Sequence, residues 1–551
     1  MLKYEKSKSK LVEFAVAKEN YPKYQLNPDD LTYTTMYALS RFCEEMIENP
    51  QSSQISELKD DLAIVSQYYD STVKTQLRSK YSKWFLLLGS TSYFLSENFG
   101  SAKVLISQIE NWYLKEDIAT LLFITLNFLL TGKWVEVPTE TKYYLDYLNG
   151  LRNHFEEGAS YETIFSTLNK MRSSVYQSDD VLDVSCIDFL YTVAICAIEY
   201  SAWILLPQYS KWSLEHWKSY FSKPNSVKLL WPAQKVILQA DVLQGKNLIV
   251  PLPTGVGKTK SIEILLRDKF MKHGSCIAVI IAPLRALCNE ITLDLSSAFR
   301  NEAIINQFTD TMQEDFNLDV LFNTKYVFIC TPEKFSYILR HEPDFLAAIQ
   351  LFIFDEAHLF DDVSRGTQYE LLVSEITRNR NDTAQMVLFS AVLSNANQIS
   401  KWLFGDETSI IDNTLVKSTE KSIGFISSDQ TIHYYDKENM EEESFYVPKS
   451  IDFTWLQLHG REKKQRVFPE KTAQDIAIYY GNKLCCQGAV AIYAGQVRSI
   501  PSIMRRIVEI HNRGYDLSNL YKNGDINEIL RIAIYLSFIT ERNLNLHKQL
   551  S

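Results

Sequence analysis

Six short apolar runs, separated by stretches that suit helices, occupy the middle of this 551-residue chain. The runs cover residues 247–252, 276–282, 303–305, 326–330, 351–354 and 386–389. They are apolar at successive positions, as in strands of a parallel sheet that helices cover on both faces. Alternation of strands and helices predicts a doubly wound α/β domain over about residues 225–420. The helix after the first run should bury Ile262, Leu265, Leu266 and Phe270, because they recur at spacings of three and four.

The regions on either side of this domain have different patterns. Residues 1–205 are rich in Leu, Phe and Ala with few Gly or Pro breaks, which predicts a helical domain ending before the turn-prone patch at 222–226. Residues 186–207 have the length of a membrane span, but Asp188, Glu199 and Pro207 favour a buried helix. Residues 421–551 are interpreted as a linker and an incomplete second α/β domain, with a further strand at 489–493.

Composition narrows the class of protein. Hydrophobic residues make up 46% of the chain and charged residues 23%, which is ordinary for a globular protein. The net charge of -10 argues against a protein that coats nucleic acid over its whole surface, although it permits a local basic channel. Eight cysteines without a CxxC pair, and an N-terminus without an apolar signal core, indicate reduced thiols and a cytoplasmic protein.

A glycine-rich loop joins the first predicted strand to the helix after it. It consists of Pro253, Thr254, Gly255, Val256, Gly257, Lys258 and Thr259. The glycines let the backbone N–H groups turn toward phosphates, and the helix N-terminus adds partial positive charge. Lys258 is expected to reach the β- and γ-phosphates, and the Thr259 hydroxyl to bind Mg²⁺. The pattern predicts an ATP–Mg²⁺ site, whereas the plainer alternative is a glycine turn with an exposed lysine.

Two acidic residues follow the fifth apolar run, in the segment Asp355, Glu356, Ala357 and His358. Carboxylates at the carboxyl end of such a strand lie beside the phosphate loop in a doubly wound sheet. Asp355 would hold Mg²⁺ through water, and Glu356 would orient and deprotonate the attacking water. A solvated Asp–Glu pair is the alternative, and the spacing from the phosphate loop argues against it.

Together these segments resemble the first motor domain of superfamily 2 DEAD/DEAH-box helicases, of RecA-like fold. The further matching segments, in chain order, are 230–234 (Q motif, with Gln234), 282–287 with Glu290 (motif Ia), Thr331 to Lys334 (motif Ib), Ser390 to Val392 (motif III), Asn395 with Trp402, and 488–496 (motif IV). Asn395 and Trp402 resemble the signature of the superkiller-like branch. The resemblance covers about residues 225–500.

The resemblance implies an ATP-dependent helicase or translocase and favours DNA over RNA as its substrate, although the sequence alone does not choose between them. It assigns adenine recognition to Gln234, contacts with strand phosphates to Arg285 and Thr331, and coupling of hydrolysis to strand movement to His358 and Ser390. The helical N-terminal region joined to this motor also resembles the helicase subunits of bacterial antiphage systems of the Hachiman type. In such systems the motor works with a separate nuclease effector.

The chain departs from the family pattern at two places. Val392 stands where motif III usually has a hydroxyl residue, and no motif V or motif VI is found. Motif VI supplies the family's arginine finger, so we expect ATP binding to exceed hydrolysis; Arg498, Arg505 and Arg506 are the substitutes to consider. Arg513 and Gly514 are interpreted as a surface loop. An ATP-gated sensor or clamp, an RNA helicase and an ATPase unrelated to nucleic acid remain alternatives.

Three other patterns favour ordinary structure over a site. Pro28 and Asp29, followed by Glu57, Leu58 and Lys59, match a nuclease pattern, but the intervening residues 33–48 predict a helix rather than paired strands. His154 and the other scattered histidines show no metal-ligand spacing. The basic run at 461–466 is more typical of a solvated loop than of a nucleic-acid patch.

Overall fold

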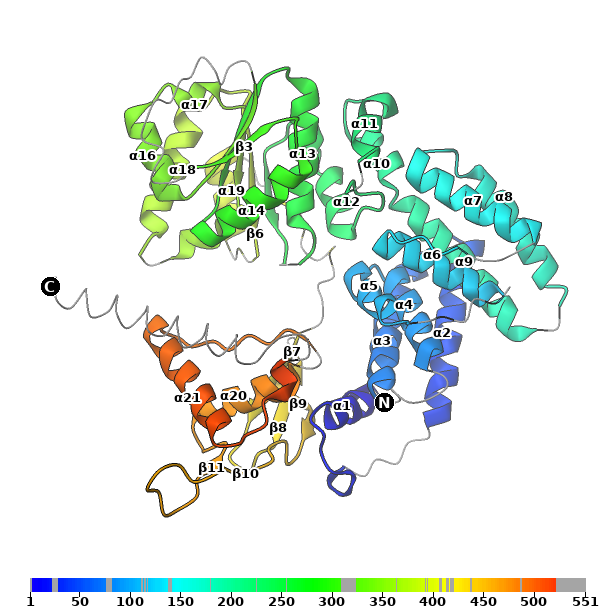
Figure 1. Cartoon of the computed structure of the whole chain (residues 1–551). Helices are drawn as coiled ribbons and strands as arrows, with labels where there is room; N and C mark the ends of the chain where they lie inside the picture. Colours follow the sequence, from blue (N-terminus) through cyan, green and yellow to red (C-terminus); the bar gives the residue numbers. More distant parts are fainter. Residues whose placement is uncertain are drawn as a thin grey trace. The chain divides into compact units, whose positions relative to one another are not determined.

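A computed structural model of the chain describes residues 2–521, apart from 22–27, 76–81, 111, 113–114, 116, 137–140, 179, 224, 254, 309–323, 363, 392, 394, 406–408, 413–415, 417–420, 437–438 and 486–487. The chain divides into two compact units (Figure 1). The large unit contains residues 29–70 and 79–420. The small unit contains residues 1–28, 71–78 and 421–551.

The large unit is built on a six-stranded parallel sheet in the order β1-β6-β5-β2-β4-β3. The strands are β1 (Leu248–Pro251), β2 (Cys276–Ile281), β3 (Ile304–Gln307), β4 (Lys325–Cys330), β5 (Leu351–Phe354) and β6 (Gln385–Ser390). Each of the six apolar runs forms or overlaps one of them. The predicted α/β fold with a RecA-like parallel sheet is confirmed.

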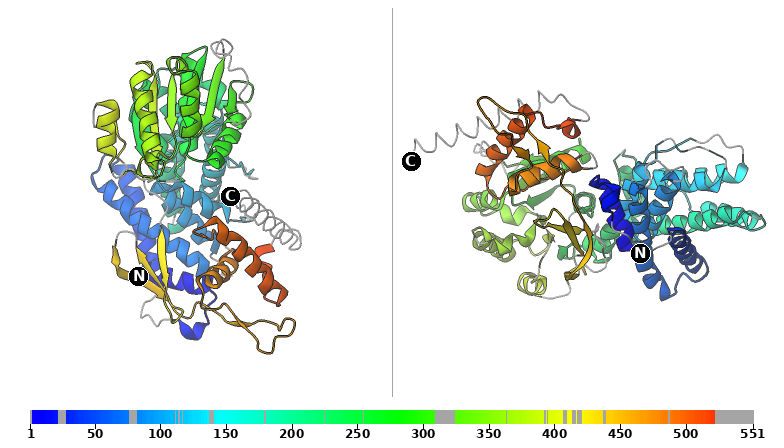
Figure 2. Two further views of the ribbon diagram at one scale, coloured as in Figure 1. Left: turned by 90° about the vertical axis from the view of Figure 1, so that its left-hand side faces the viewer. Right: turned by 90° about the horizontal axis from the view of Figure 1, so that it is seen from below.

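Helices cover both faces of this sheet (Figures 1 and 2). One face packs against α12 (Pro232–Gln239), α13 (Lys258–Lys272) and α14 (Arg285–Ala298). The other packs against α16 (Pro332–His341), α17 (Phe345–Ala348), α18 (Gly366–Asn379) and α19 (Ala396–Phe404). Successive strand residues enter opposite cores: Leu248 and Val250 lie in the first, and Ile249 lies in the second. This double burial explains why the strands are apolar at successive positions.

Helix α13 buries the four side chains that its periodicity predicts, namely Ile262, Leu265, Leu266 and Phe270. It also buries a charged group, because Glu263 and Arg267 are almost inaccessible and form an ion pair of 3.0 Å. The guanidinium of Arg267 lies over the rings of Tyr220 and Phe299. The helix that follows the glycine-rich loop is therefore anchored by charge pairing as well as by apolar packing.

A helical region precedes the sheet in the large unit. Its helices are α2 (Pro28–Glu48), α3 (Gln54–Thr75), α4 (Ser82–Leu95), α5 (Phe99–Ser107), α6 (Ile118–Thr131), α7 (Lys142–Glu157), α8 (Glu162–Val175), α9 (Val181–Glu199), α10 (Ala202–Tyr209) and α11 (Leu214–Phe221). The Asp117 side chain caps α6 by accepting from Thr120 N, and Gly132 ends it in the left-handed conformation. Neighbouring helices pack as α4 with α5, α6 with α9, and α7 with α8.

Within the part of the chain that the structure describes, α9 alone is long and apolar enough to cross a membrane. In its most apolar 18-residue window, 56% of the residues are buried inside the fold. Its Asp188 pairs with Arg172 at 2.8 Å. These contacts are those of a core helix, which agrees with the interpretation made from Asp188 and Glu199.

The helical region and the sheet are joined through backbone and side-chain contacts. Leu230 N donates to Tyr200 O at 2.8 Å, and Lys235 pairs with Glu199 at 2.5 Å. Trp203 and Trp217 lie in the same apolar cluster as strand β1. The domain boundaries expected at 205 and 225 fall within this shared core, and they stay predictions.

The small unit combines the first helix of the chain with antiparallel strands. Helix α1 (Leu2–Glu13) packs on the three-stranded sheet of β7 (Ser422–Ile426), β8 (Ile432–Asp436) and β9 (Asn439–Val447). A second pairing joins β10 (Thr454–Trp455) to β11 (Val467–Phe468), followed by α20 (Ala473–Leu484) and α21 (Ile500–Asn512). Residues 1–28 thus group with this unit rather than with the other N-terminal helices.

The strand predicted at 489–493 is wrong. The backbone there forms no strand, and Val490, Ile492 and Tyr493 are exposed. An apolar run indicates β-propensity, but a strand also needs a neighbour to accept and donate its hydrogen bonds. No described residue of the small unit supplies a parallel neighbour to this segment. The second α/β domain proposed for 421–551 therefore stays a prediction.

Candidate nucleotide and nucleic-acid site

The glycine-rich loop runs from the end of β1 to the first residue of α13. Gly255 and Gly257 have φ angles of 82° and 89°, in the left-handed region that favours glycine. At Gly257 two features disfavour a side chain. One is the left-handed φ, and the other is that a Cβ would lie 2.8 Å from Gln234 Nε2. Lys258 and Thr259 begin the helix and are half-buried, while Thr254 lies outside the described residues. The loop has the conformation that a phosphate-binding loop requires.

Lys258 has a buried Nζ atom for which the structure shows no hydrogen-bond partner. Burial lowers the pKa of Lys258, and the nearby carboxylates Glu356 and Asp355 oppose that shift. A buried cation without a partner is costly unless an anion completes it. The orphaned ammonium group therefore fits a loop that binds phosphate.

Asp355 and Glu356 follow β5 directly, so they lie at the carboxyl edge of the sheet. The backbone N–H of Asp355 donates to Ile281 O of β2 at 2.8 Å, which fixes its position at that edge. Burial raises the pKa of Asp355, Glu356 raises it further, and Lys258 lowers it. Glu356 has a left-handed φ of 52° and a buried Oε2 atom without a hydrogen-bond partner. A strained glutamate with a buried oxygen that lacks a hydrogen bond is typical of reactive sites.

Gln234 braces the loop from α12. Its Oε1 accepts from Trp231 N at 2.8 Å, and its Nε2 donates to Gly257 O at 3.4 Å. The side chain is almost completely buried. Gln234 therefore lies beside the phosphate loop and links that loop to the start of α12, and its role in adenine recognition stays a prediction.

Arg285 and Thr331 line a pocket of about 350 Å³ at the other side of the carboxyl edge. The remaining lining residues are Cys288, Gln307, Phe308, Cys330 and Lys334. Arg285 begins α14 and Thr331 is the N-cap residue of α16, so each follows a central strand. The two residues that were predicted to contact strand phosphates are brought together, with Lys334 as a further cation.

Arg365 connects the two segments that carry this pocket. Its Nε donates to Glu333 Oε1 at 2.7 Å, and its Nη2 donates to Pro283 O at 2.9 Å. Burial raises the pKa of Glu333, but hydrogen bonds to its own backbone and to Arg365 outweigh burial and lower it overall. No sequence pattern pointed to Arg365, because it lies 82 positions from Pro283.

Residues 231–399 match the family model described as DEAD/DEAH box helicase. The chain carries a DEAD/DEAH box helicase domain. The match includes Gln234, the phosphate loop, the acidic segment and the pocket of Arg285, which are the features described above.

Two curated relatives extend this result. The chain is 24% identical over 528 residues to the Hachiman protein HamB of Bacillus cereus, covering 89% of this chain and 46% of the relative. It is 29% identical over 182 residues to the ATP-dependent DNA helicase Hel308 of Thermococcus kodakarensis, covering 33% of this chain and 15% of that protein. The chain thus spans less than half the length of both relatives.

Solved structures show weaker likeness. The DUF1998 helicase MrfA bound to DNA is 14% identical with a TM-score of 0.38, over 56% of this chain and 40% of that one. Because this TM-score is below 0.5, we assign the fold of the helicase domain from its strand order alone.

Residues expected to couple hydrolysis to movement lie on neighbouring elements of the helicase domain. Ser390 ends β6 and is fully buried, whereas Val392 lies outside the described residues. His358 Nδ1 lies 3.2 Å from Glu356 Oε2, within ion-pair distance but without hydrogen-bond geometry. Trp402 of α19 packs edge-on against Phe360, in the 3-10 turn η3 (Ala357–Asp361) that follows Glu356.

Asn395 and Glu290 complete the predicted helicase segments. Asn395 precedes α19, and its buried Oδ1 shows no hydrogen-bond partner. Glu290 lies at an exposed position of α14. Burial is the main cause that raises the pKa of Asp355, and the charge of Glu290 adds to it. Glu290 therefore acts on the acidic segment through its charge.

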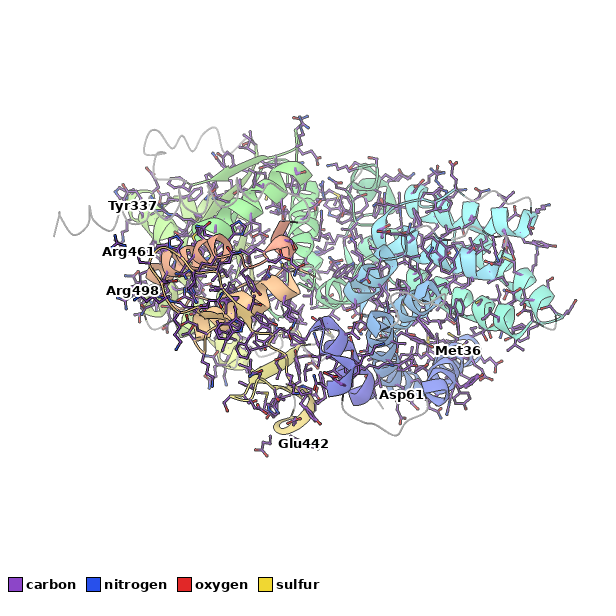
Figure 3. All side chains as sticks on the ribbon, turned by 60° about the horizontal axis from the view of Figure 1, so that its bottom comes forward. Met36, Asp61, Tyr337, Glu442, Arg461 and Arg498 are labelled. Carbon is purple, nitrogen blue, oxygen red and sulfur yellow. The ribbon has the colours of Figure 1, made fainter. Side chains whose placement is uncertain are left out.

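The arginines of the small unit have specific partners. Arg513 is not a surface-loop residue as predicted: its side chain is 8% exposed and pairs with Glu462 at 2.6 Å. Arg506 pairs with Asp475 at 2.6 Å and with Glu509 at 2.9 Å. Arg505 Nε donates to Pro501 O at 3.3 Å, and the exposed Arg498 donates to Gln496 at 2.5 Å (Figure 3). Ion pairing commits Arg506 and Arg513 to structure within this unit.

The nuclease-like pattern and the scattered histidines belong to ordinary structure. Pro28 and Asp29 belong to α2, and Glu57 and Lys59 belong to α3, so neither segment is a strand. His154 is bonded to Ala159 O and to Ser201 Oγ. Among the described residues, no cluster of His, Cys, Asp or Glu could hold a metal ion.

Proposed function

We propose that this chain is the ATP-binding part of an ATP-dependent DNA helicase or translocase. One observation carries the proposal: the buried Lys258 Nζ has no hydrogen-bond partner and lies in the field of Asp355 and Glu356 at the carboxyl edge of the sheet. A cation so placed suits the β- and γ-phosphates of a nucleotide. The match to the DEAD/DEAH box helicase family supports the same function.

In this proposal each residue at the edge has one role. The backbone N–H groups of Gly255 to Thr259 face the phosphates, and Lys258 neutralises the β- and γ-oxygens. Glu356 accepts the proton of the attacking water, and Gln234 holds the loop against α12 near the adenine. Asp355 and Thr259 offer the hard oxygen ligands that suit Mg²⁺. Mg²⁺, when bound, neutralises the charge that develops on the transferred phosphoryl group.

A nucleic-acid strand would lie across the pocket of Arg285, Thr331 and Lys334. Two cations and a helix N-terminus suit phosphate oxygens and carry no base information. His358 contacts Glu356, and Trp402 contacts Phe360 in the turn that follows it, so both are placed to transmit a change at the nucleotide.

The relatives favour DNA as the substrate and defence as the setting. Hel308 is described as a DNA helicase, and HamB, which aligns with 89% of this chain, is described as a Hachiman protein. We therefore propose that this chain acts in a bacterial antiphage system, in the cytoplasm, with a nuclease effector as its partner. Copurification of the co-expressed nuclease with this chain would support that partnership, and failure to copurify would count against it.

The test of the proposed function is thermodynamic coupling between ATP and nucleic acid. We expect single-stranded DNA to tighten Mg²⁺–ATP binding by about fivefold or more, and RNA to do so less, because coupled sites differ by about 1–3 kcal/mol. Lys258→Ala should abolish ATP binding, and Lys260→Ala, two residues along the same helix, should not. Equal effects of RNA would favour an RNA helicase. If neither DNA nor RNA changes the affinity for ATP, the chain is an ATPase unrelated to nucleic acid.

A further inference from the structure

A second pocket lies at the phosphate loop, on the side of the helical region. It has about 410 Å³ of space and is lined by Glu97, Asn98, Phe99, Gly100, Ser101, Trp231, Pro232, Ala233, Gly255, Val256 and Val416. All of these residues belong to the large unit. Five of them, residues 97–101, form the connection after α4 and the first turn of α5, and they are far from the helicase segments in the sequence.

This turn, residues 97–101, is held by contacts on its far side. Glu97 has a left-handed φ of 67°, and its carboxylate pairs with Lys59 at 2.5 Å. Phe99 stacks on Phe94 at 4.6 Å and meets Tyr200 edge-on at 5.1 Å. A strained residue persists only where its surroundings over-determine it. The turn is therefore a fixed wall rather than a loose loop.

The opposite wall is tied to the phosphate loop itself. Trp231 precedes α12, and its ring lies 3.5 Å from the place where a Cβ on Gly100 would stand. Gln234 connects Trp231 N to Gly257 O, so the Trp231 wall and the loop are positioned together. Gly255 and Val256 of the loop complete the pocket. A nucleotide whose phosphates occupy the loop would have this pocket within reach.

The pocket combines flat apolar surface with a few polar groups. Trp231, Pro232 and Val256 provide the apolar surface, while Asn98 and Ser101 provide side-chain oxygens. Helix α5 begins at Phe99 without a side-chain cap, so the first-turn N–H groups depend on partners outside the helix. Aromatic surface beside directed donors and acceptors is what a nucleobase needs.

We propose that the turn of residues 97–101 is the wall of the base pocket for the nucleotide bound at the phosphate loop, so that the helical region takes part in nucleotide selection. The inference rests on the proposed function, because it requires a nucleotide at Lys258. The ligand class is a purine nucleoside triphosphate, whose base lies against the surface where Trp231 meets residues 97–101.

The test fills the pocket without touching the phosphate loop. Ser101→Trp places a large ring in the pocket, and Val104→Trp places the same ring on the exposed face of the same helix. We expect Ser101→Trp to weaken ATP binding about tenfold or more, the scale of one lost base stack, and Val104→Trp to leave it unchanged. Inorganic tripolyphosphate with Mg²⁺, which has no base, should bind both variants as it binds the wild type.

The outcomes separate the two proposals. Failure of the wild type to bind ATP, or of Lys258→Ala to lose both ligands, would refute the proposed function. A loss of ATP affinity below about tenfold in Ser101→Trp, or an equal loss of tripolyphosphate, would overturn only the assignment of the base pocket. Photolabelling of the unaltered chain with 8-azido-ATP needs no variant. We expect adducts on residues 97–101 or on Trp231, and adducts confined to other segments would overturn the assignment.

Discussion

At the scale of single residues, the two buried polar atoms of Lys258 and Glu356 differ in what they would do with ATP. Under the proposed function, Lys258 Nζ would contribute charge to the bound state, whereas Glu356 would contribute to the attack of water. Because binding and chemistry use different residues, substitutions should separate them.

We predict that Lys258→Ala loses ATP binding and that Glu356→Gln keeps it. Glu356→Gln should slow hydrolysis by about 10²–10⁴-fold, the range for loss of a general base. Equilibrium binding of ATP and single-turnover hydrolysis measure the two effects. The control is Lys260→Ala, since Lys260 lies on the same helix and pairs with Glu263 at 2.8 Å. Normal hydrolysis by Glu356→Gln would show that Glu356 is not the base.

Asp268 of α13 gives a prediction about pH. Burial raises the pKa of Asp268 from 3.8 to about 6, although Lys269 and a hydrogen bond from Trp212 lower it. Between pH 4 and pH 6 the folded chain holds a proton that the unfolded chain has lost, so this group destabilises the fold as the pH rises through that window. Above pH 6 the penalty is complete.

Asp268→Asn should therefore raise the free energy of unfolding at pH 7 by up to about 3 kcal/mol, at 1.36 kcal/mol per unit of pKa. The gain should shrink to nothing below about pH 4, where the wild-type carboxyl is protonated in both states. Urea unfolding at pH 4, 5, 6 and 7 measures it. A gain that does not change with pH would contradict the assignment to Asp268.

Arg285 should act on nucleic acid through charge alone. Arg285→Ala is expected to weaken DNA binding about equally across sequences and to reduce the salt slope by roughly one ion. Arg300, an exposed residue just after the same helix, is the matched control, and Arg300→Ala should leave the slope unchanged. Binding isotherms at several salt concentrations measure the salt slope of each variant. A loss that depends on sequence would count against backbone contact.

At the scale of elements, most of the six strands could be predicted because burial on both faces leaves a continuous apolar run in each, although the edge strand β3 is only partly buried. The loop and the acidic segment could be placed because both follow such strands. The segment 489–493 has the same composition and forms no strand, since propensity does not supply a neighbour.

Two parts of the candidate site could not be predicted from local patterns. The α4–α5 turn reaches the phosphate loop only through tertiary packing, about 150 positions away in the sequence. The polar turn around Arg513 predicts a solvated side chain. The structure buries it, because Glu462 pairs with the guanidinium group. Long-range partners of this kind leave no periodic signal.

The buried ion pair of α13 gives a prediction at this scale. Arg267→Ala would leave Glu263 buried with only Lys260 as a partner, which should cost about 3–5 kcal/mol of stability. The double variant Arg267→Ala, Glu263→Gln should recover part of that loss, because the uncompensated charge is removed. Denaturant unfolding of both variants measures the coupling. Equal stability of the single and double variants would show that the charge pair does not anchor α13.

At the scale of the whole molecule, the proposed function assigns phosphate binding and a base to the carboxyl edge of the sheet and leaves the arginine finger to be assigned. Arg506 and Arg513 are committed to ion pairs inside the small unit. An arginine finger raises the rate of nucleotide hydrolysis by about 10³–10⁵-fold.

We predict that the purified 551-residue chain binds Mg²⁺–ATP but turns it over very slowly, and that a longer chain or a partner subunit restores the rate. Steady-state ATPase assays with single-stranded DNA, overhang duplex and RNA measure this. Fast, nucleic-acid-stimulated turnover by the chain alone would contradict the prediction. Arg498→Ala and Arg505→Ala would then show which arginine acts.

The strand order has a consequence for how the protein is made. Strand β1 ends at Pro251, but its neighbour in the sheet is β6, which begins at Gln385. A ribosome that adds about 5–20 residues per second needs roughly ten seconds or more to cover that stretch. During this time the strand that leads into the phosphate loop has emerged without its pairing partner. The segment before the phosphate loop therefore stays without its β6 partner throughout this interval, when a chaperone could hold it.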